Sequence, residues 1–223
     1  MSRIPARERK RLEAMMQYER QAREWGYLLI AGIDEAGRGP LAGPVVAAAC
    51  ILPDSTLLAG IDDSKKLSPE ERSALFKQIL ALPGIDCGIG IIDSQTIDKY
   101  NILQATFQAM AAAVSKLSRQ PDFILVDGNK LPKIAIPGQA IVSGDSLSQS
   151  IAAASILAKV TRDELMETYH KMWPLYGFVS HKGYGTEEHL LAIQNYGPCP
   201  IHRMSFEPLA SLGRKDLQLD LFS

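Results

Sequence analysis

The sequence contains little that would support a disulfide framework, a zinc site or a membrane span. Its three cysteines, Cys50, Cys87 and Cys199, are far apart and form no CxxC pair, which is typical of small apolar residues in a reducing cytosol. None of its four histidines lies at metal-ligand spacing from another. No apolar run approaches the length of a membrane span, and the first residues are charged rather than signal-like. We therefore expect a soluble cytoplasmic protein that acts as a monomer without a membrane partner.

The sequence also lacks an excess of charge of either sign. The formal net charge is −1 and the pI is about 6.4, so no global basic field indicates a nucleic-acid partner, although a local basic cleft is still possible. The chain has 223 residues, of which 46% are hydrophobic. That is enough for one large domain or two small ones with a full core.

The first acidic feature stands at the end of an apolar stretch. The run from Tyr27 to Ile33 predicts a buried strand, and it ends in two adjacent acids, Asp34 and Glu35. The turn Gly37-Arg38-Gly39 follows, and a second strand is expected over residues 45–52. Buried carboxylates are costly unless a cation neutralises them. A divalent metal explains both acids and the glycines, whereas a purely structural Asp34–Arg38 pair leaves Glu35 unexplained.

The remaining patterns predict a single α/β domain with a mixed sheet and helices on its faces. Residues 85–93 form a third expected strand, and the first three strands, joined by short connections, predict an antiparallel meander. Ser68, Pro69 and Glu71 predict a capped helix start. Further strands end near Asp127 and Asp145, and helices are expected over 96–118, 148–171 and 186–196. We divide the chain into a helical extension (1–25), an α/β domain with a C-terminal helical segment (26–212) and a flexible tail (213–223).

Four acids, Asp34, Glu35, Asp127 and Asp145, each follow a strand of the same expected sheet. Parallel strands place their C-terminal ends at one edge, which is where open α/β sheets hold their sites. Ligands that are oxygen only suit Mg²⁺ or Mn²⁺ rather than zinc, and two such ions can clamp a phosphodiester displacement. Neighbouring strand residues face opposite sides, so Asp34 and Glu35 share a site only if the strand bends there. Asp163 competes for the fourth position, but a surface pair with Lys159 explains it more simply.

An ordered set of motifs is similar to bacterial ribonuclease HII. The matching stretches are GIDEAGRGPLAGPVVAAA, DDSKKLS, YNILQAT, LVDGNKLP, GDSLSQSIAAASILAKVTRDELM, YGFVSHKGYGT and HRMSFEPL, which run in order over residues 28–212. The resemblance implies a ribonuclease H-like fold and a metal-dependent endonuclease that cuts the RNA strand of RNA–DNA hybrids. It also implies nicking of duplex DNA on the 5′ side of one embedded ribonucleotide, leaving 3′-hydroxyl and 5′-phosphate ends, in replication and repair.

The resemblance also implies roles for individual residues. Asp34, Glu35, Asp127 and Asp145 match the family's metal-binding acids. Gly37, Arg38 and Gly39 match the turn that reads the ribose 2′-hydroxyl, which distinguishes RNA from DNA, and Tyr184 matches the tyrosine that stacks on the next deoxyribose. Phosphate contacts are implied for Ser64, Lys65 and Asn101. From the residues alone, a packing role is the simpler explanation of Tyr184, and solvated loop charges explain Ser64 and Lys65 equally well.

Two other hypotheses remain open at this point. One is a nuclease of the same fold that cuts structured DNA, against which the glycine turn and Tyr184 argue. The other is a non-catalytic hybrid-binding module. The presence of all four acids argues against it, because pure binding would favour the removal of negative charge beside phosphates.

The last residues resemble the pentapeptide with which bacterial replication and repair proteins bind the sliding clamp. Gln218, Leu219, Asp220, Leu221 and Phe222 form this stretch. Such a peptide places apolar anchors in a groove while the glutamine makes orienting hydrogen bonds. Packing back onto the domain is the simpler alternative.

Overall fold

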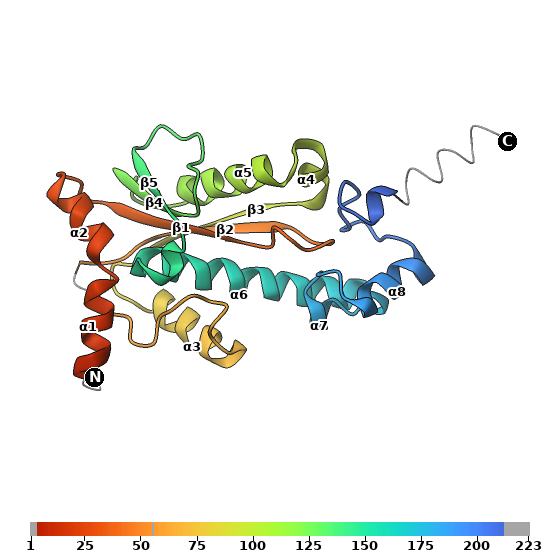
Figure 1. Cartoon of the computed structure of the whole chain (residues 1–223), viewed down its shortest axis with the longest axis horizontal. Coiled ribbons are helices and arrows are strands. Elements are labelled where there is room, and N and C mark those ends of the chain that lie inside the picture. Colours follow the sequence, from red (N-terminus) through yellow and green to blue (C-terminus); the bar gives the residue numbers. More distant parts are fainter. Residues whose placement is uncertain (1–3, 55, 212–223) are drawn as a thin grey trace.

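The computed structural model describes residues 4–54 and 56–211, which form a mixed sheet covered by helices on both faces (Figure 1). The sheet order within these residues is β3-β2-β1-β4-β5. The strands are β1 (Ile30–Ala36), β2 (Val45–Ile51), β3 (Asp86–Ile92), β4 (Phe123–Asp127) and β5 (Gly138–Ile141). The helices are α1 (Ala6–Ala14), α2 (Gln17–Glu24), α3 (Pro69–Leu80), α4 (Ser94–Tyr100), α5 (Ile102–Ser115), α6 (Gln149–Met172), α7 (Phe178–His181) and α8 (Glu187–Tyr196), with 3₁₀ turns η1 (Gly144–Ser146) and η2 (Pro174–Tyr176).

The sheet combines an antiparallel half with a parallel half. β1 pairs antiparallel with β2, and β2 with β3, while β1, β4 and β5 run parallel. The predicted mixed sheet and the antiparallel pairing are therefore confirmed. The prediction of short connections was wrong between β2 and β3, because α3 lies between them. The parallel half brings the C-terminal ends of three strands to one edge, which is the edge that the acids occupy.

Two helices cover the faces of the sheet, α5 on one side and α6 on the other (Figure 1). Alternate residues of β2 serve the two layers: Val46 and Ala48 face α6 and α3, whereas Ala47 and Ala49 face α5. Small residues allow α6 to lie very close to the sheet. A Cβ on Gly32 of β1 would stand 2.1 Å from the Ser150 carbonyl carbon of α6.

The helix predictions succeeded except at one place. The predicted helices at 148–171 and 186–196 correspond to α6 and α8, and Ser68 forms the expected capping box with Glu71. The predicted helix at 96–118 is instead two helices, α4 and α5. They are separated at Asn101, whose φ is 67° and whose side chain accepts a hydrogen bond from the Gln104 N–H at 3.1 Å. A left-handed residue ends one helix while its own amide caps the next.

The N-terminal helices α1 and α2 pack against the rest of the fold. Leu12 and Met15 belong to the apolar cluster beneath α3 and α6. Glu19 of α2 is buried against the start of α6. There it accepts hydrogen bonds from the Ser148 hydroxyl at 2.6 Å and the Ser150 hydroxyl at 2.7 Å. This extension therefore supports the helix that follows Asp145.

At the other end of the molecule, α7 and α8 form the predicted C-terminal helical segment. Tyr176, Phe178 and Ile193 build a separate small core with the end of α6. No helix in the described part of the chain is long and apolar enough to cross a membrane. The expected tail, residues 213–223, lies outside the described residues.

Candidate active site

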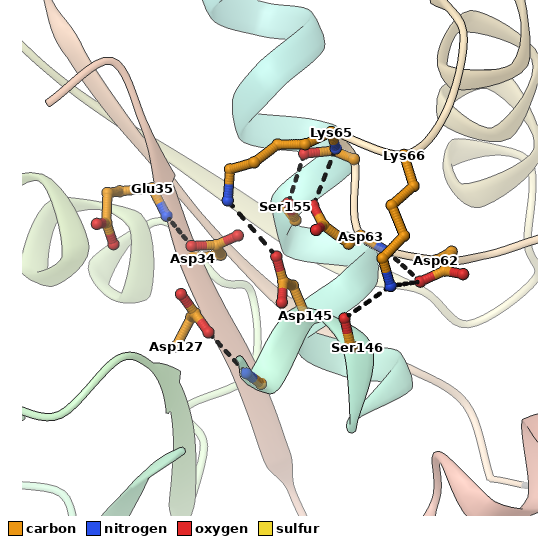
Figure 2. A network of polar contacts seen from close by, with 12 residues as sticks. Asp34, Glu35, Asp62, Asp63, Lys65, Lys66, Asp127, Asp145, Ser146 and Ser155 are labelled. Atoms are coloured by element: carbon orange, nitrogen blue, oxygen red, sulfur yellow. Dashed lines mark hydrogen bonds and ion pairs between the residues drawn. The ribbon is translucent and has the colours of Figure 1, made fainter. Parts of the chain in front are cut away.

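The four predicted acids lie around the edge where β1, β4 and η1 end (Figure 2). Asp127 is the last residue of β4, and Asp145 is in η1, just after β5. Asp34 and Glu35 lie within β1 rather than after it, opposite Ala48 and Ala47 of β2. The parallel pairing of β1 with β4 ends at Ile33↔Val126, so both acids stand where β1 has lost its neighbour on that side.

Adjacent residues of a strand face opposite sides, yet both acids of β1 reach the same region. Asp34 is buried and lies in a hollow of about 260 Å³ on the α6 side. Glu35 lines that hollow and also a second one of about 260 Å³, which Asp127 and α5 residues line. Because Glu35 lies between the two hollows, the carboxylates of Asp34, Glu35 and Asp127 influence one another electrostatically.

The electrostatics of this edge are unfavourable as they stand. Burial raises the pKa of Asp34 well above its usual value, and the charges of Glu35 and Asp127 raise it further. Burial also raises the pKa of Glu35, which Arg38 partly opposes. The pKa of Asp145 is raised to about 6 by burial and then by Asp63 and Asp127. These carboxylates repel one another and gain from any cation that binds between them.

The side-chain cations that reach the acids are mostly exposed. Arg38 Nη1 lies 3.3 Å from Glu35 Oε1, and Lys65 Nζ lies 3.7 Å from Asp145 Oδ2 (Figure 2 shows the second pair). Their side chains are 50% and 79% exposed, so water weakens both attractions. Arg38 contacts Glu35 and not Asp34, which rejects the structural Asp34–Arg38 pair considered from the sequence.

The donor set suits a hard divalent ion, although the acids are not arranged around one. Among residues 4–54 and 56–211, no group of three histidine, cysteine or acidic side chains lies in a position to hold a metal. The carboxylates are instead held by backbone N–H groups: Asp34 by Glu35 at 2.7 Å, and Asp127 by Gly144 at 2.7 Å. Oxygen-only ligands that repel one another nevertheless fit Mg²⁺ or Mn²⁺, because the raised pKa values of Asp34, Glu35 and Asp145 indicate uncompensated negative charge.

The glycine turn and Tyr184 line the same hollow as Asp34 and Glu35. Gly37, Arg38, Gly39 and Tyr184 all line it. A Cβ on Gly39 would stand 3.6 Å from Tyr184 Cε1, so the turn and the ring are in contact range. Tyr184 is 48% exposed, which leaves its ring free to meet a ligand.

Ser64 and Lys65 line the same hollow, but Asn101 does not. The Ser64 hydroxyl lies 2.8 Å from that of Ser155, and Lys65 faces Asp145. Asn101 lines neither hollow and uses its side-chain oxygen to cap α5. Asp163 lines neither hollow, and Lys159 Nζ lies 2.7 Å from its carboxylate, which confirms the expected pair.

Several residues at the site were not identified from the sequence. Ser155 and Arg162 of α6 line the first hollow, and Asn129 and Lys130 line the second. Asp63 raises the pKa of Asp145. The position of Ser155 on the sheet-facing, alanine-rich side of α6 was the one available signal, since a serine there must point at the sheet edge.

The fold and the acidic edge define a nuclease of the ribonuclease H-like class. The structure resembles that of ribonuclease H2 from Pyrococcus horikoshii, with a TM-score of 0.70 and 26% identity over 84% of this chain and 98% of that one. A ribonuclease HIII structure in complex with Mn²⁺ shares the fold, with a TM-score of 0.65 and 20% identity over 86% of this chain and 70% of that one. Enzymes of the ribonuclease H family depend on a metal ion.

Sequence comparison then gives the family. The family described as ribonuclease HII matches residues 31–209. Ribonuclease HII of Chlamydia trachomatis serovar L2 is 56% identical over 192 residues, covering 86% of this chain and 88% of the relative. That of Bacillus pumilus is 52% identical over 198 residues, covering 89% and 77%. The chain belongs to the ribonuclease HII family, and it is an endoribonuclease that acts on RNA–DNA hybrids.

Proposed function

We propose that this chain hydrolyses the RNA strand of hybrids and nicks duplex DNA on the 5′ side of an embedded ribonucleotide, leaving 3′-hydroxyl and 5′-phosphate ends. The observation that carries the proposal is one hollow that combines two functions. It is lined by Asp34 and Glu35 and also by the glycine turn and Tyr184. Metal-dependent cleavage needs the first pair, and recognition of a ribose followed by a deoxyribose needs the second.

Asp34, Glu35, Asp127 and Asp145 would hold two Mg²⁺ or Mn²⁺ ions. Bound there, the ions would supply charge neutralisation and an activated water for displacement at the phosphate. The chain's part is to present the oxygens. Asp34 is fixed by the Glu35 N–H, and Asp127 by the Gly144 N–H, so both side chains have a preset direction before any ion arrives.

The glycine turn and Tyr184 would recognise the ribose. A 2′-hydroxyl both donates and accepts hydrogen bonds, and the exposed Arg38–Gly39 backbone can approach it because Gly39 carries no side chain. The Tyr184 ring beside Gly39 would lie against the following sugar, where a second 2′-hydroxyl would crowd it. Ser64 and Lys65 would contact a phosphate near Asp145. Asn101 would contact one further away.

Cleavage of matched duplexes tests this proposal. The substrates are one duplex with a single ribonucleotide, one long RNA–DNA hybrid and one all-DNA duplex, each incubated with Mg²⁺. We expect one nick at the 5′ side of the ribonucleotide, cuts throughout the hybrid and no cut in the DNA. Cleavage of the all-DNA duplex would indicate a structure-specific nuclease instead.

We further propose that the tail binds the sliding clamp through Gln218, Leu219, Leu221 and Phe222. These residues lie outside the described part of the chain, and the support is their sequence. A protein of the same fold supplies a precedent: the solved PCNA:RNase HII complex from Archaeoglobus fulgidus matches this chain with a TM-score of 0.66 and 24% identity over 81% of this chain and 96% of that one.

A labelled peptide of residues 214–223 should bind purified bacterial clamp. In the full chain, Leu221→Ala with Phe222→Ala should remove clamp binding without changing cleavage of short duplexes. Absence of binding at high micromolar clamp would contradict this second proposal and leave the nuclease proposal intact.

A further inference from the structure

Two arginines next to the active site are completely buried without an acidic partner. Arg162 of α6 is 1% exposed, and Arg203, which follows α8, is 0% exposed. Neither forms an ion pair with any residue in the described part of the chain. A buried guanidinium without a counter-charge is costly, and burial indeed lowers the pKa of both. The hydrogen-bond partners of the two side chains indicate why this cost is tolerated.

Both arginines donate their hydrogen bonds to backbone carbonyls of one segment, residues 37–44. Arg203 donates to the carbonyls of Gly37 at 2.6 Å, Arg38 at 2.9 Å and Gly43 at 2.9 Å. Arg162 donates from Nε to the Pro44 carbonyl at 3.0 Å and from Nη2 to the Ala42 carbonyl at 3.1 Å. The glycine turn is therefore attached to the protein interior by its oxygen atoms.

This attachment decides which way the turn's N–H groups point. The peptide unit is planar and trans, so an N–H points opposite to the carbonyl of the preceding residue. With the Gly37 and Arg38 carbonyls directed at Arg203, the N–H groups of Arg38 and Gly39 point away from the interior. No acceptor among the described residues takes either N–H. Both residues are exposed and line the hollow.

Arg162 also connects the turn to the tyrosine segment. Its Nη1 donates to the Lys182 carbonyl at 3.0 Å, two residues before Tyr184. One guanidinium thus bonds both the segment of the glycine turn and that of Tyr184. The fit around it is close, because a Cβ on Gly37 would stand 2.0 Å from Arg162 Nε.

We propose that Arg162 and Arg203 are positioning residues for ribose recognition: they hold the carbonyls of residues 37–44 inward, so that the N–H groups of Arg38 and Gly39 face the substrate's 2′-hydroxyl. Arg162 additionally sets the separation between this turn and Tyr184. The inference rests on the proposed reading of ribose by the turn, and it assigns that ability to two side chains whose hydrogen bonds go to backbone carbonyls.

The test compares the binding of two duplexes without catalysis. Arg203→Lys and Arg162→Lys keep a positive charge but lose the planar fork that bonds several carbonyls at once. Affinities for a duplex with one ribonucleotide and for the same all-DNA duplex are measured by fluorescence anisotropy in EDTA. We expect the ribonucleotide preference to fall by about tenfold in each lysine variant, while affinity for the all-DNA duplex stays the same.

The matched control is Arg119→Lys. Arg119 also bonds a carbonyl, that of Gly84 at 3.0 Å, and lies 3.5 Å from Asp86 at the start of β3, away from the hollow. It should keep the full preference for the ribonucleotide. Circular dichroism establishes the temperature at which each variant begins to unfold, and binding is compared below that temperature.

Each result has a distinct meaning. A preserved preference in both folded lysine variants overturns the inference, as does an equal loss of affinity for both duplexes. Failure of both variants to fold also overturns it, because the arginines would then be purely architectural. A wild-type protein without any preference contradicts the proposed function of the turn itself, which is a separate failure.

Discussion

The hollow lined by Asp34, the glycine turn and Tyr184 adjoins two regions that accommodate buried charge in opposite ways. The acidic edge holds carboxylates whose pKa values are raised by burial and by one another. The glycine turn is held by Arg162 and Arg203, whose charges are matched by carbonyl oxygens instead of carboxylates. Arg162 and Asp34 line the same hollow without forming an ion pair.

The glycine turn is therefore organised without a ligand, whereas the acidic edge needs one. The carbonyl groups of the turn are hydrogen-bonded by the protein alone, so the direction of its outward N–H groups is set before the substrate arrives. The acids are left under mutual repulsion, a condition that divalent ions relieve. Pairing Arg162 with Asp34 would have neutralised both charges, but it would have cost the turn its support and the edge its attraction for cations.

The largest expected effect is that of Asp34→Asn on cleavage. Losing one metal ligand should remove about 4 kcal/mol of transition-state stabilisation, or about 10³-fold in rate. The metal-free variant should at the same time be more stable than the wild type by about 1 kcal/mol, because a buried and repelled carboxylate is gone. Single-turnover rates in Mg²⁺ and urea unfolding in EDTA measure the two effects.

Asp163→Asn provides the control, since Asp163 pairs with Lys159 outside the acidic edge. It should cleave at the wild-type rate. Full activity of Asp34→Asn at ordinary Mg²⁺ would remove Asp34 from the proposed metal site.

The second expectation concerns the arginine-held turn and uses two glycines with similar backbone angles. Gly37 has φ +92° and faces Arg162, whereas Gly26 has φ +96° with nothing within 4 Å of an added Cβ. Gly26→Ala should cost about 1 kcal/mol of unfolding free energy, for the left-handed backbone alone. Gly37→Ala should cost about 3 kcal/mol, because Arg162 must also move. Similar losses in urea unfolding would show that Arg162 is not held tightly.

A smaller effect should come from Tyr184→Ala. Removing the ring should slow cleavage at a single ribonucleotide about tenfold more than cleavage within a long hybrid. Only the first substrate places a deoxyribose next to the cleaved ribonucleotide. The ratio of kcat/KM for the two substrates measures this difference, with Tyr196→Ala as an exposed control outside the hollow. Equal losses on both substrates would make the ring structural.

The smallest expected effect is a pH dependence at the acidic edge. The pKa of Asp145 is about 6 in the folded protein, against 3.8 for an ordinary aspartate. The folded state therefore binds the carboxyl proton more tightly than the unfolded state does. The carboxyl therefore destabilises the metal-free fold above pH 6, and this penalty decreases as the pH falls from 6 towards 4. Asp145→Asn should exceed the wild type in stability by about 1 kcal/mol at pH 7.5 and by much less at pH 4.5. Urea unfolding in EDTA at both pH values measures this stability difference. A difference that is the same at both pH values would contradict the raised pKa of Asp145.

The sequence predicted the acidic edge because its signal is local. Strands ending in acids can be identified one at a time, and parallel pairing then brings their ends together. The predicted bend at Asp34 and Glu35 was unnecessary for a reason that lies outside the strand. β4 separates from β1 after Ile33, so Glu35 can lie between the two hollows.

The arginine-held turn could not be predicted in the same way. Nothing near Arg162 or Arg203 in the sequence distinguishes them from exposed arginines, since their acceptors are carbonyls 118 and 166 residues away along the chain. The break at Asn101 escaped for a related reason. The surrounding residues favour a helix, and only a left-handed backbone at one position interrupts it.

The central claim is that the acidic edge is a two-cation site, and counting bound Mn²⁺ tests it most directly. The protein is titrated with Mn²⁺ in the presence of an all-DNA duplex, and bound ions are counted by electron paramagnetic resonance. Beyond the ions that the duplex binds alone, we expect two ions per wild-type chain and fewer in Asp34→Asn, with Asp163→Asn unchanged. An equal number of ions in wild type and Asp34→Asn would contradict the claim.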